Sequence, residues 1–152
     1  MIIIVCTDDP RLVRIADASI RKAPKIYGLR HQIFRNELPK LSRDEDLFII
    51  AHGAFQGDEG QPVIGDHTAA FYLSGDQCYL NMATVFPEGY KGRIFVDACQ
   101  SADDSPDIDS FITTLQTQFL VNEQNVQVYG INGASSGLIP LPDDPKWVPA
   151  QL

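Results

Sequence analysis

The fold is decided by residues 92–101, GRIFVDACQS, read together with residues 46–53, DLFIIAHG. Both stretches are short apolar runs that end in a chemically capable residue, Cys99 in the first and His52 in the second. Runs rich in β-branched and aromatic residues that stop at small or polar ones are typical of buried parallel strands. Parallel strands of an open α/β sheet all deliver their carboxyl ends to one edge, so we expect His52 and Cys99 on the same edge.

A thiol beside an imidazole is the minimum for nucleophilic catalysis. The imidazole takes the proton of the sulfur, and the thiolate attacks a carbonyl carbon. We therefore predict Cys99 as the nucleophile and His52 as the base on attack and the acid toward the leaving amine. Taken alone, Cys99 would instead be a buried strand cysteine acting as a small hydrophobe, and His52 an ordinary residue at a strand end.

The two runs together resemble the caspase-like (clan CD) cysteine peptidases, whose marks are one apolar strand ending in His-Gly and another ending in Ala-Cys or Ser-Cys. Here these marks are residues 49–53, IIAHG, and residues 94–99, IFVDAC. The histidine of caspases also lies roughly 50 residues before the cysteine. Residues 97–101, DACQS, are closer to metacaspases and clostripain than to true caspases. The resemblance implies a three-layer αβα fold with a mostly parallel central sheet and a hairpin insertion between the His and Cys strands.

The resemblance also implies how a polypeptide substrate binds. Backbone N–H groups of Gly53 and Cys99 would form the oxyanion hole. Asp97 would receive the Arg or Lys side chain before the scissile bond, as the matching aspartate does in metacaspases and clostripain, which predicts cleavage after basic residues. The wall of this pocket would come from Ala134, Ser135 and Ser136. Two alternatives are that Asp97 accepts bonds from neighbouring backbone and that the 132–137 loop is a flexible turn.

Length, charge and cysteine content limit the number of domains, the class of partner and the compartment. The 152 residues suit a single domain, 1–152. A formal net charge of −8 argues against nucleic acid or an anionic membrane surface as partner, is compatible with a cationic peptide, and also serves solubility. Three cysteines leave an odd count and favour a reducing, cytoplasmic location over a disulfide-stapled secreted domain. We find no signal peptide and no apolar run near the roughly 20 residues of a membrane helix.

The first predicted strand, within residues 1–6, is followed by a helix start. Asp9 can cap the helix, and Pro10 fits its first position. A nucleotide-binding domain would carry a glycine-rich phosphate loop here, whereas Asp8 and Asp9 would repel phosphate. A flavodoxin-like small-molecule binder is therefore disfavoured.

Other elements are predicted less directly. We expect a short strand at 25–29, a helical stretch within 33–41, a hairpin with strands near 70–73 and 78–80, and a strand at 125–131. Ser105 and Pro106 indicate the start of a helix. The acids of residues 103–109 could bind calcium, which activates some relatives, but their spacing is not that of a known calcium loop and helix capping explains them. Asp66 and His67 are too few for a metal site. We predict no cofactor.

Two questions stay open at this level. No third catalytic residue is assigned, although Asp46 or a backbone carbonyl could orient His52. The chain is shorter than most relatives, which is compatible with a dimer or a regulatory partner. A catalytically silent caspase-like module that binds or regulates a protein partner is the second functional hypothesis.

Overall fold

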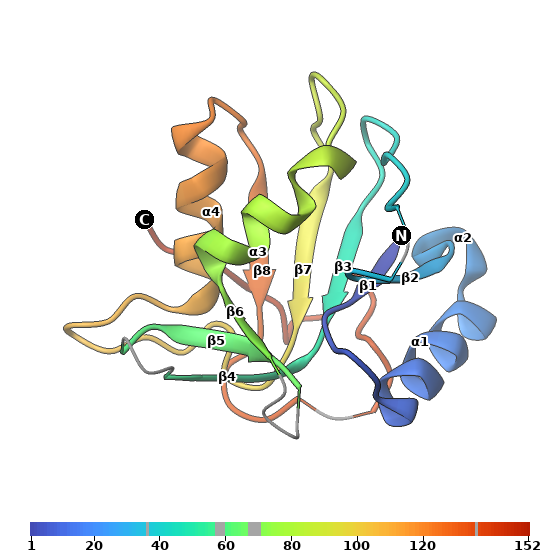
Figure 1. Cartoon of the computed structure of the whole chain (residues 1–152), viewed down its shortest axis with the longest axis horizontal. Coiled ribbons are helices and arrows are strands. Elements are labelled where there is room, and N and C mark those ends of the chain that lie inside the picture. Colours follow the sequence, from blue (N-terminus) through green and yellow to red (C-terminus); the bar gives the residue numbers. More distant parts are fainter. Residues whose placement is uncertain (36, 57–59, 67–70, 136) are drawn as a thin grey trace.

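A six-stranded sheet lies at the centre of the computed structural model, which describes residues 1–35, 37–56, 60–66, 71–135 and 137–152, without the side chains of Phe55 and Gln56. In spatial order its strands are β2 (Arg30–Gln32), β1 (Ile2–Ile4), β3 (Leu47–Ile50), β7 (Arg93–Asp97), β8 (Gln127–Gly130) and β9 (Val148–Pro149). Neighbours from β2 to β8 pair in parallel, and β9 is an antiparallel edge strand (Figure 1). The predicted mixed α/β fold with a mostly parallel sheet is confirmed.

Helices pack against the two faces of this sheet. Helices α1 (Pro10–Lys22) and α2 (Pro24–Tyr27) contribute to one buried cluster, and α3 (Gly75–Met82) and α4 (Phe111–Val121) contribute to the other. Figure 1 shows α3 and α4 side by side, away from α1 and α2. This layering is compatible with an αβα arrangement. None of the helices in the described ranges is long and apolar enough to cross a membrane.

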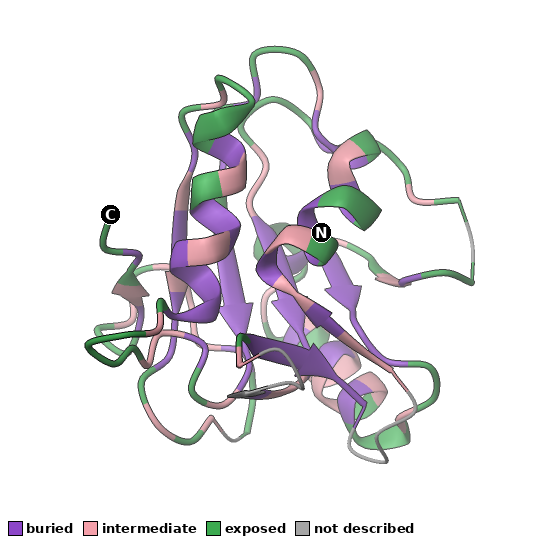
Figure 2. Ribbon diagram, turned by 60° about the vertical axis from the view of Figure 1, so that its left-hand side comes forward, coloured by how far each residue is buried: buried purple, intermediate pink, exposed green. Residues whose placement is uncertain are grey.

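The continuous apolar runs of the sequence arise because both faces of the central strands are covered. In β1, Ile3 belongs to the cluster under α3 and α4, whereas Ile2 and Ile4 belong to the cluster under α1 and α2. Successive strand side chains point to opposite faces, so a strand buried on both sides needs apolar residues at every position. Figure 2 shows these strands as buried along their length.

A second, antiparallel sheet lies between the two motif strands in sequence. It consists of β4 (His52–Gln56), β5 (Pro62–Gly65) and β6 (Tyr72–Ser74). An antiparallel insertion was predicted here, and the strand expected near 70–73 overlaps β6, but the strand expected at 78–80 was wrong, because these residues belong to α3. Ser74 does not begin a hairpin turn: its hydroxyl accepts from Gln77 N–H and the Gln77 side chain returns to Ser74 N–H, a capping box that starts α3.

The strand predicted at 25–29 and the predicted first residue of the helix after Cys99 were also wrong. Residues 25–27 belong to α2, because Pro24 suits a first helical position and Gly28, with φ of 67°, ends the helix. Helix α4 begins at Phe111, capped by Ser110, and not at Pro106. Both Ser105 and Ser110 could cap a helix, but the buried stripe of α4 begins only at Phe111, so packing selects the later serine.

The expected helical stretch within 33–41 was also wrong. Its described residues, 33–35 and 37–41, contain no helix. Phe34 has a φ of 67°, and Pro39 would interrupt a helix in this region. Ile33 and Leu41 are nevertheless buried, so their apolar spacing reflects anchors of a loop on the core.

Candidate functional site

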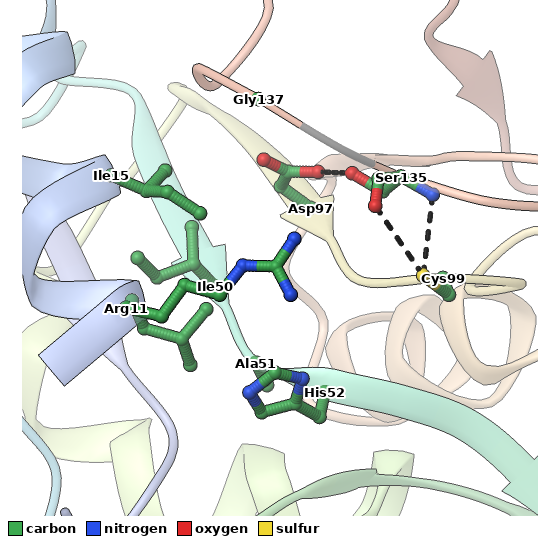
Figure 3. A pocket seen from close by; sticks show the side chains of 10 residues that line it. Arg11, Ile15, Ile50, Ala51, His52, Asp97, Cys99, Ser135 and Gly137 are labelled. Atoms are coloured by element: carbon green, nitrogen blue, oxygen red, sulfur yellow. Dashed lines mark hydrogen bonds between the residues drawn. The ribbon is translucent and has the colours of Figure 1, made fainter. Parts of the chain in front are cut away.

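A small pocket opens at the carboxyl end of β3 and β7, beside the start of α1. Its cavity is about 100 Å³. The described residues that line it are Arg11, Leu12, Ile15, Ile50, Ala51, His52, Asp97, Cys99, Ser135 and Gly137 (Figure 3). Ile50 and Asp97 are register partners on the neighbouring strands β3 and β7. Because these strands run in parallel, the residues that follow them leave the sheet at the same edge, as the sequence predicted.

Cys99 lies in the turn that follows β7 and is held by the loop after β8. Its sulfur accepts a hydrogen bond from Ser135 N–H at 3.2 Å and donates one to the Ser135 carbonyl at 3.5 Å. The carbonyl of Cys99 accepts from Ala54 N–H, which joins the turn to β4. The side chain is partly exposed and its thiol is free.

The other two cysteines have different surroundings. Cys6 and Cys78 are fully buried. Burial raises the pKa of the Cys78 thiol to about 12, and burial together with the neighbouring Asp66 raises that of Cys6 to about 12. A thiolate is therefore strongly disfavoured at both sites, so neither is a candidate nucleophile.

His52 is the first residue of β4, and its imidazole is bound by Asp9. The His52 Nε2 atom lies 2.5 Å from Asp9 Oδ2, with both side chains largely buried. Burial alone would raise the pKa of Asp9, but the His52 hydrogen bond, helix N–H groups and the attraction of the imidazole hold it below its ordinary value.

Asp9 has two functions in the structure. Its Oδ1 atom accepts from the N–H groups of Arg11 at 3.0 Å and Leu12 at 3.1 Å and so caps α1, as predicted. Its contact with His52 was missed by the sequence analysis. One signal was available, because Asp9 follows the first parallel strand and must emerge at the same sheet edge as His52.

Asp46, the acid considered as a partner of His52, lies elsewhere. It precedes β3, at the opposite end of the sheet, and its carboxylate binds the Arg93 guanidinium at 2.8 Å and the Arg93 N–H at 3.1 Å. The possibility that Asp46 orients His52 is therefore not supported by its position. The acid that contacts the imidazole comes from the loop after β1, because β1 is the immediate neighbour of β3 in the sheet.

Asp97 ends β7 within the pocket and is only 8% exposed. Burial raises the pKa of its carboxyl to about 6, against the opposing effects of the Ser135 hydroxyl and of Lys146. The Ser135 hydroxyl donates to Asp97 Oδ1. Within the described ranges, no Arg or Lys side chain lies at ion-pair distance from Asp97. Leu12, Ile15 and Ile50 supply apolar walls nearby.

The remaining predicted site residues are not all at the pocket. Gly53, which follows His52 in β4, and Ala134 are not among the described residues that line it. Gly53 has a φ of 106°, a conformation that favours glycine over other residues. Ser136 lies outside the residues that the structure describes, as does His67.

Asp66, which with His67 is too little for a metal site, is buried and accepts hydrogen bonds from within the chain. It accepts from Thr7 N–H at 2.7 Å and from the Thr7 hydroxyl at 2.5 Å. It therefore ties β5 to the loop that carries Asp9. Over the described parts of the chain, no three His, Cys, Asp or Glu side chains are grouped so as to hold a metal ion.

Comparisons with known proteins add no relative to this description. No protein-family model matches the chain, and neither a curated protein nor a solved structure matches it. The pocket residues and the resemblance of residues 49–53 and 94–99 to caspase-like peptidases therefore carry the proposed function.

Proposed function

We propose that this protein is a caspase-like cysteine endopeptidase that cleaves polypeptides after Arg or Lys through Cys99 and His52. One observation carries the proposal: a free cysteine, a histidine and a buried aspartate line a single pocket at the carboxyl edge of a parallel sheet. These are the groups that the motif resemblance assigns to nucleophile, base and specificity residue. The mostly parallel sheet with an antiparallel insertion between β3 and β7 is also compatible with a caspase-like fold.

The proposed reaction begins with transfer of the Cys99 thiol proton to His52. The sulfur then bonds to the carbonyl carbon of the substrate, and the resulting oxyanion is stabilised by backbone N–H groups. His52 returns the proton to the amine as the C–N bond breaks, and water hydrolyses the remaining thioester. Asp9 would hold the imidazole orientation and stabilise its charged form, because its carboxylate contacts Nε2.

Gly53 and Cys99 stay the proposed source of the oxyanion donors. The hydrogen bond from Ala54 N–H to the Cys99 carbonyl holds this part of β4 against the Cys99 turn. Two N–H groups aimed at one oxygen would each contribute about 3 kcal/mol to lowering the barrier.

The proposed specificity follows from the surroundings of Asp97. A buried carboxylate is costly unless it meets a cation or several donors. Within the pocket Asp97 accepts a hydrogen bond from a neutral hydroxyl, that of Ser135. The apolar side chains of Leu12, Ile15 and Ile50 could pack along the methylene groups of a Lys or Arg stem. Arg11 also lines the pocket but forms no ion pair with Asp97, so a basic substrate side chain would supply the cationic partner of this carboxylate.

Peptide reporters ending in Arg, Lys, Asp or Leu before the cleaved bond test the proposal. We expect cleavage after Arg and Lys, loss of cleavage in Cys99→Ala and little change in the matched control Cys78→Ala, whose cysteine is buried away from the pocket. Preference for Asp or Leu would contradict the role of Asp97. No cleavage of any reporter, with slow and unselective thiol labelling, would instead favour the silent binding module.

We further propose a reducing, cytoplasmic setting. The three cysteines of the chain are all free thiols in the structure, and the reaction needs Cys99 unoxidised. Activity measured with and without a reductant tests the second point, since oxidation of Cys99 would abolish cleavage reversibly.

A further inference from the structure

Ser135 contacts two different groups of the pocket at once. Its side-chain hydroxyl donates to the Asp97 carboxylate, while its main chain both donates to the Cys99 sulfur at 3.2 Å and accepts from it at 3.5 Å (Figure 3). One residue therefore joins the acid at one end of the pocket to the thiol at the other.

The loop that carries Ser135 is anchored just before it. Gln100 N–H donates to the Gly133 carbonyl at 2.6 Å, and Gly133 N–H donates to the Asp103 carboxylate at 2.9 Å. With the base of the loop held in this way, the hydroxyl bond to Asp97 adds a side-chain contact that helps to orient the Ser135 peptide beside the sulfur.

In the present geometry the Cys99 S–H is directed at the Ser135 carbonyl. A thiol uses both Ser135 groups, as a donor to the carbonyl and an acceptor from the N–H. Transfer of this proton to His52 must break the bond to the carbonyl, whereas the Ser135 N–H can keep its bond to the sulfur. Movement of the Ser135 peptide away from the sulfur would remove this restraint on proton transfer to His52.

We propose that Ser135 is a positioning residue through which a cationic side chain bound at Asp97 increases the reactivity of Cys99. This inference rests on the proposed function for its physiological meaning. A guanidinium or ammonium group competes with the Ser135 hydroxyl for the Asp97 oxygens, because charge-assisted hydrogen bonds are stronger than neutral ones. Release of the hydroxyl frees the Ser135 peptide, so the substrate residue that fits the pocket also activates the nucleophile.

The test measures alkylation of Cys99 by iodoacetamide, a small neutral reagent, with and without butylguanidine. In the wild-type protein we expect saturable acceleration of about three- to tenfold, and none from the uncharged butylurea. Asp97→Asn should abolish the acceleration, because it removes the charge that attracts the guanidinium. Equal acceleration by butylurea, or no acceleration by butylguanidine, would overturn the proposal.

Two variants of Ser135 distinguish coupling between Asp97 and Cys99 from a general disturbance of the pocket. Ser135→Ala keeps the main-chain groups but loses the hydroxyl, so Cys99 should react faster without ligand and become insensitive to butylguanidine. Ser135→Thr keeps the hydroxyl and should restore wild-type behaviour. Wild-type acceleration in Ser135→Ala would overturn the role of the hydroxyl. Absence of coupling in a protein that cleaves after Arg defeats only this inference, whereas coupling without any peptide cleavage defeats only the proposed peptidase.

Discussion

The two ends of the central sheet hold acidic side chains in opposite ways. At the amino end, Asp46 forms an ion pair with Arg93, and the Met1 amine lies 3.1 Å from Glu45. At the carboxyl end, Asp97 is buried against a serine hydroxyl and its pKa is raised to about 6. The comparison teaches that Asp46 and Glu45 each have a local cationic partner, whereas Asp97, unlike its neighbour Asp9 with His52, forms no ion pair with a described residue. Asp97 is the carboxylate that the proposed function assigns to a basic substrate side chain.

The largest expected difference concerns thiol reactivity. A position at the carboxyl end of the sheet is not sufficient to make a thiol reactive. Cys6 also follows a parallel strand there but is fully buried. With a pKa of about 12, Cys6 and Cys78 would be ionised to only about one part in 10⁵ at pH 7. We expect iodoacetamide to label Cys99 at least about 1,000-fold faster than either, as measured by peptide mapping of the native protein.

His52 should account for part of that difference. We expect His52→Ala to slow Cys99 labelling while leaving Cys6 and Cys78 protected. Comparable labelling of all three cysteines in folded protein would show that the carboxyl end is not chemically distinct.

The second prediction concerns Asp97 and pH. Its carboxyl holds a proton up to about pH 6 in the folded state, against 3.8 for the ordinary group, so the folded state binds more protons between these values. The wild-type free energy of unfolding should therefore fall as pH rises from about 4 to 6 and stay lower above that. The shift corresponds to at most about 3 kcal/mol.

Asp97→Asn removes this cost and tests its source. The variant should be more stable than wild type by about 1–3 kcal/mol at pH 7.5, and the gain should vanish near pH 3.5, as measured by urea unfolding. The same variant should lose the preference for basic reporters. A variant less stable than wild type at pH 7.5 would mean that the Asp97 charge is already compensated, as it is for Asp46.

The third prediction separates the two contacts of Asp9. Asn caps helices as well as Asp does, so Asp9→Asn should keep stability close to wild type while slowing Cys99 alkylation and peptide cleavage at least about tenfold. Asp9→Ala should lose both, with a further cost of about 1 kcal/mol in the free energy of unfolding. Unchanged alkylation in Asp9→Asn would show that the acid serves only as a helix cap.

The smallest effect is expected at the amino end. Asp46→Asn should lower the free energy of unfolding by about 0.5–1 kcal/mol, because Arg93 is nearly half exposed and exposed ion pairs contribute little. It should leave Cys99 alkylation unchanged. A tenfold loss of reactivity in this variant would remove the distinction between the two ends of the sheet.

Much of the fold was predictable because the continuous apolar runs of the sequence mark strands that are buried on both faces. Strands β1, β3 and β7 are apolar on both faces, and Asp9 with Pro10 marks the start of α1. Errors occurred where two local signals competed. Ser105 and Ser110 are equivalent as caps, and residues 25–27 are compatible with strand or helix, so packing against the rest of the molecule decided between them.

The sequence alone determined that His52, Asp97 and Cys99 lie at or just beyond the ends of buried strands and that parallel strands bring them to one edge. Only the tertiary structure decided which side chains meet there. Asp9 contacts His52 across 43 positions of sequence, and Ser135 contacts Cys99 and Asp97 across 36 and 38. Strand periodicity carries information about which face a residue occupies, whereas contacts between separate loops depend on strand order and loop path, which no local pattern encodes.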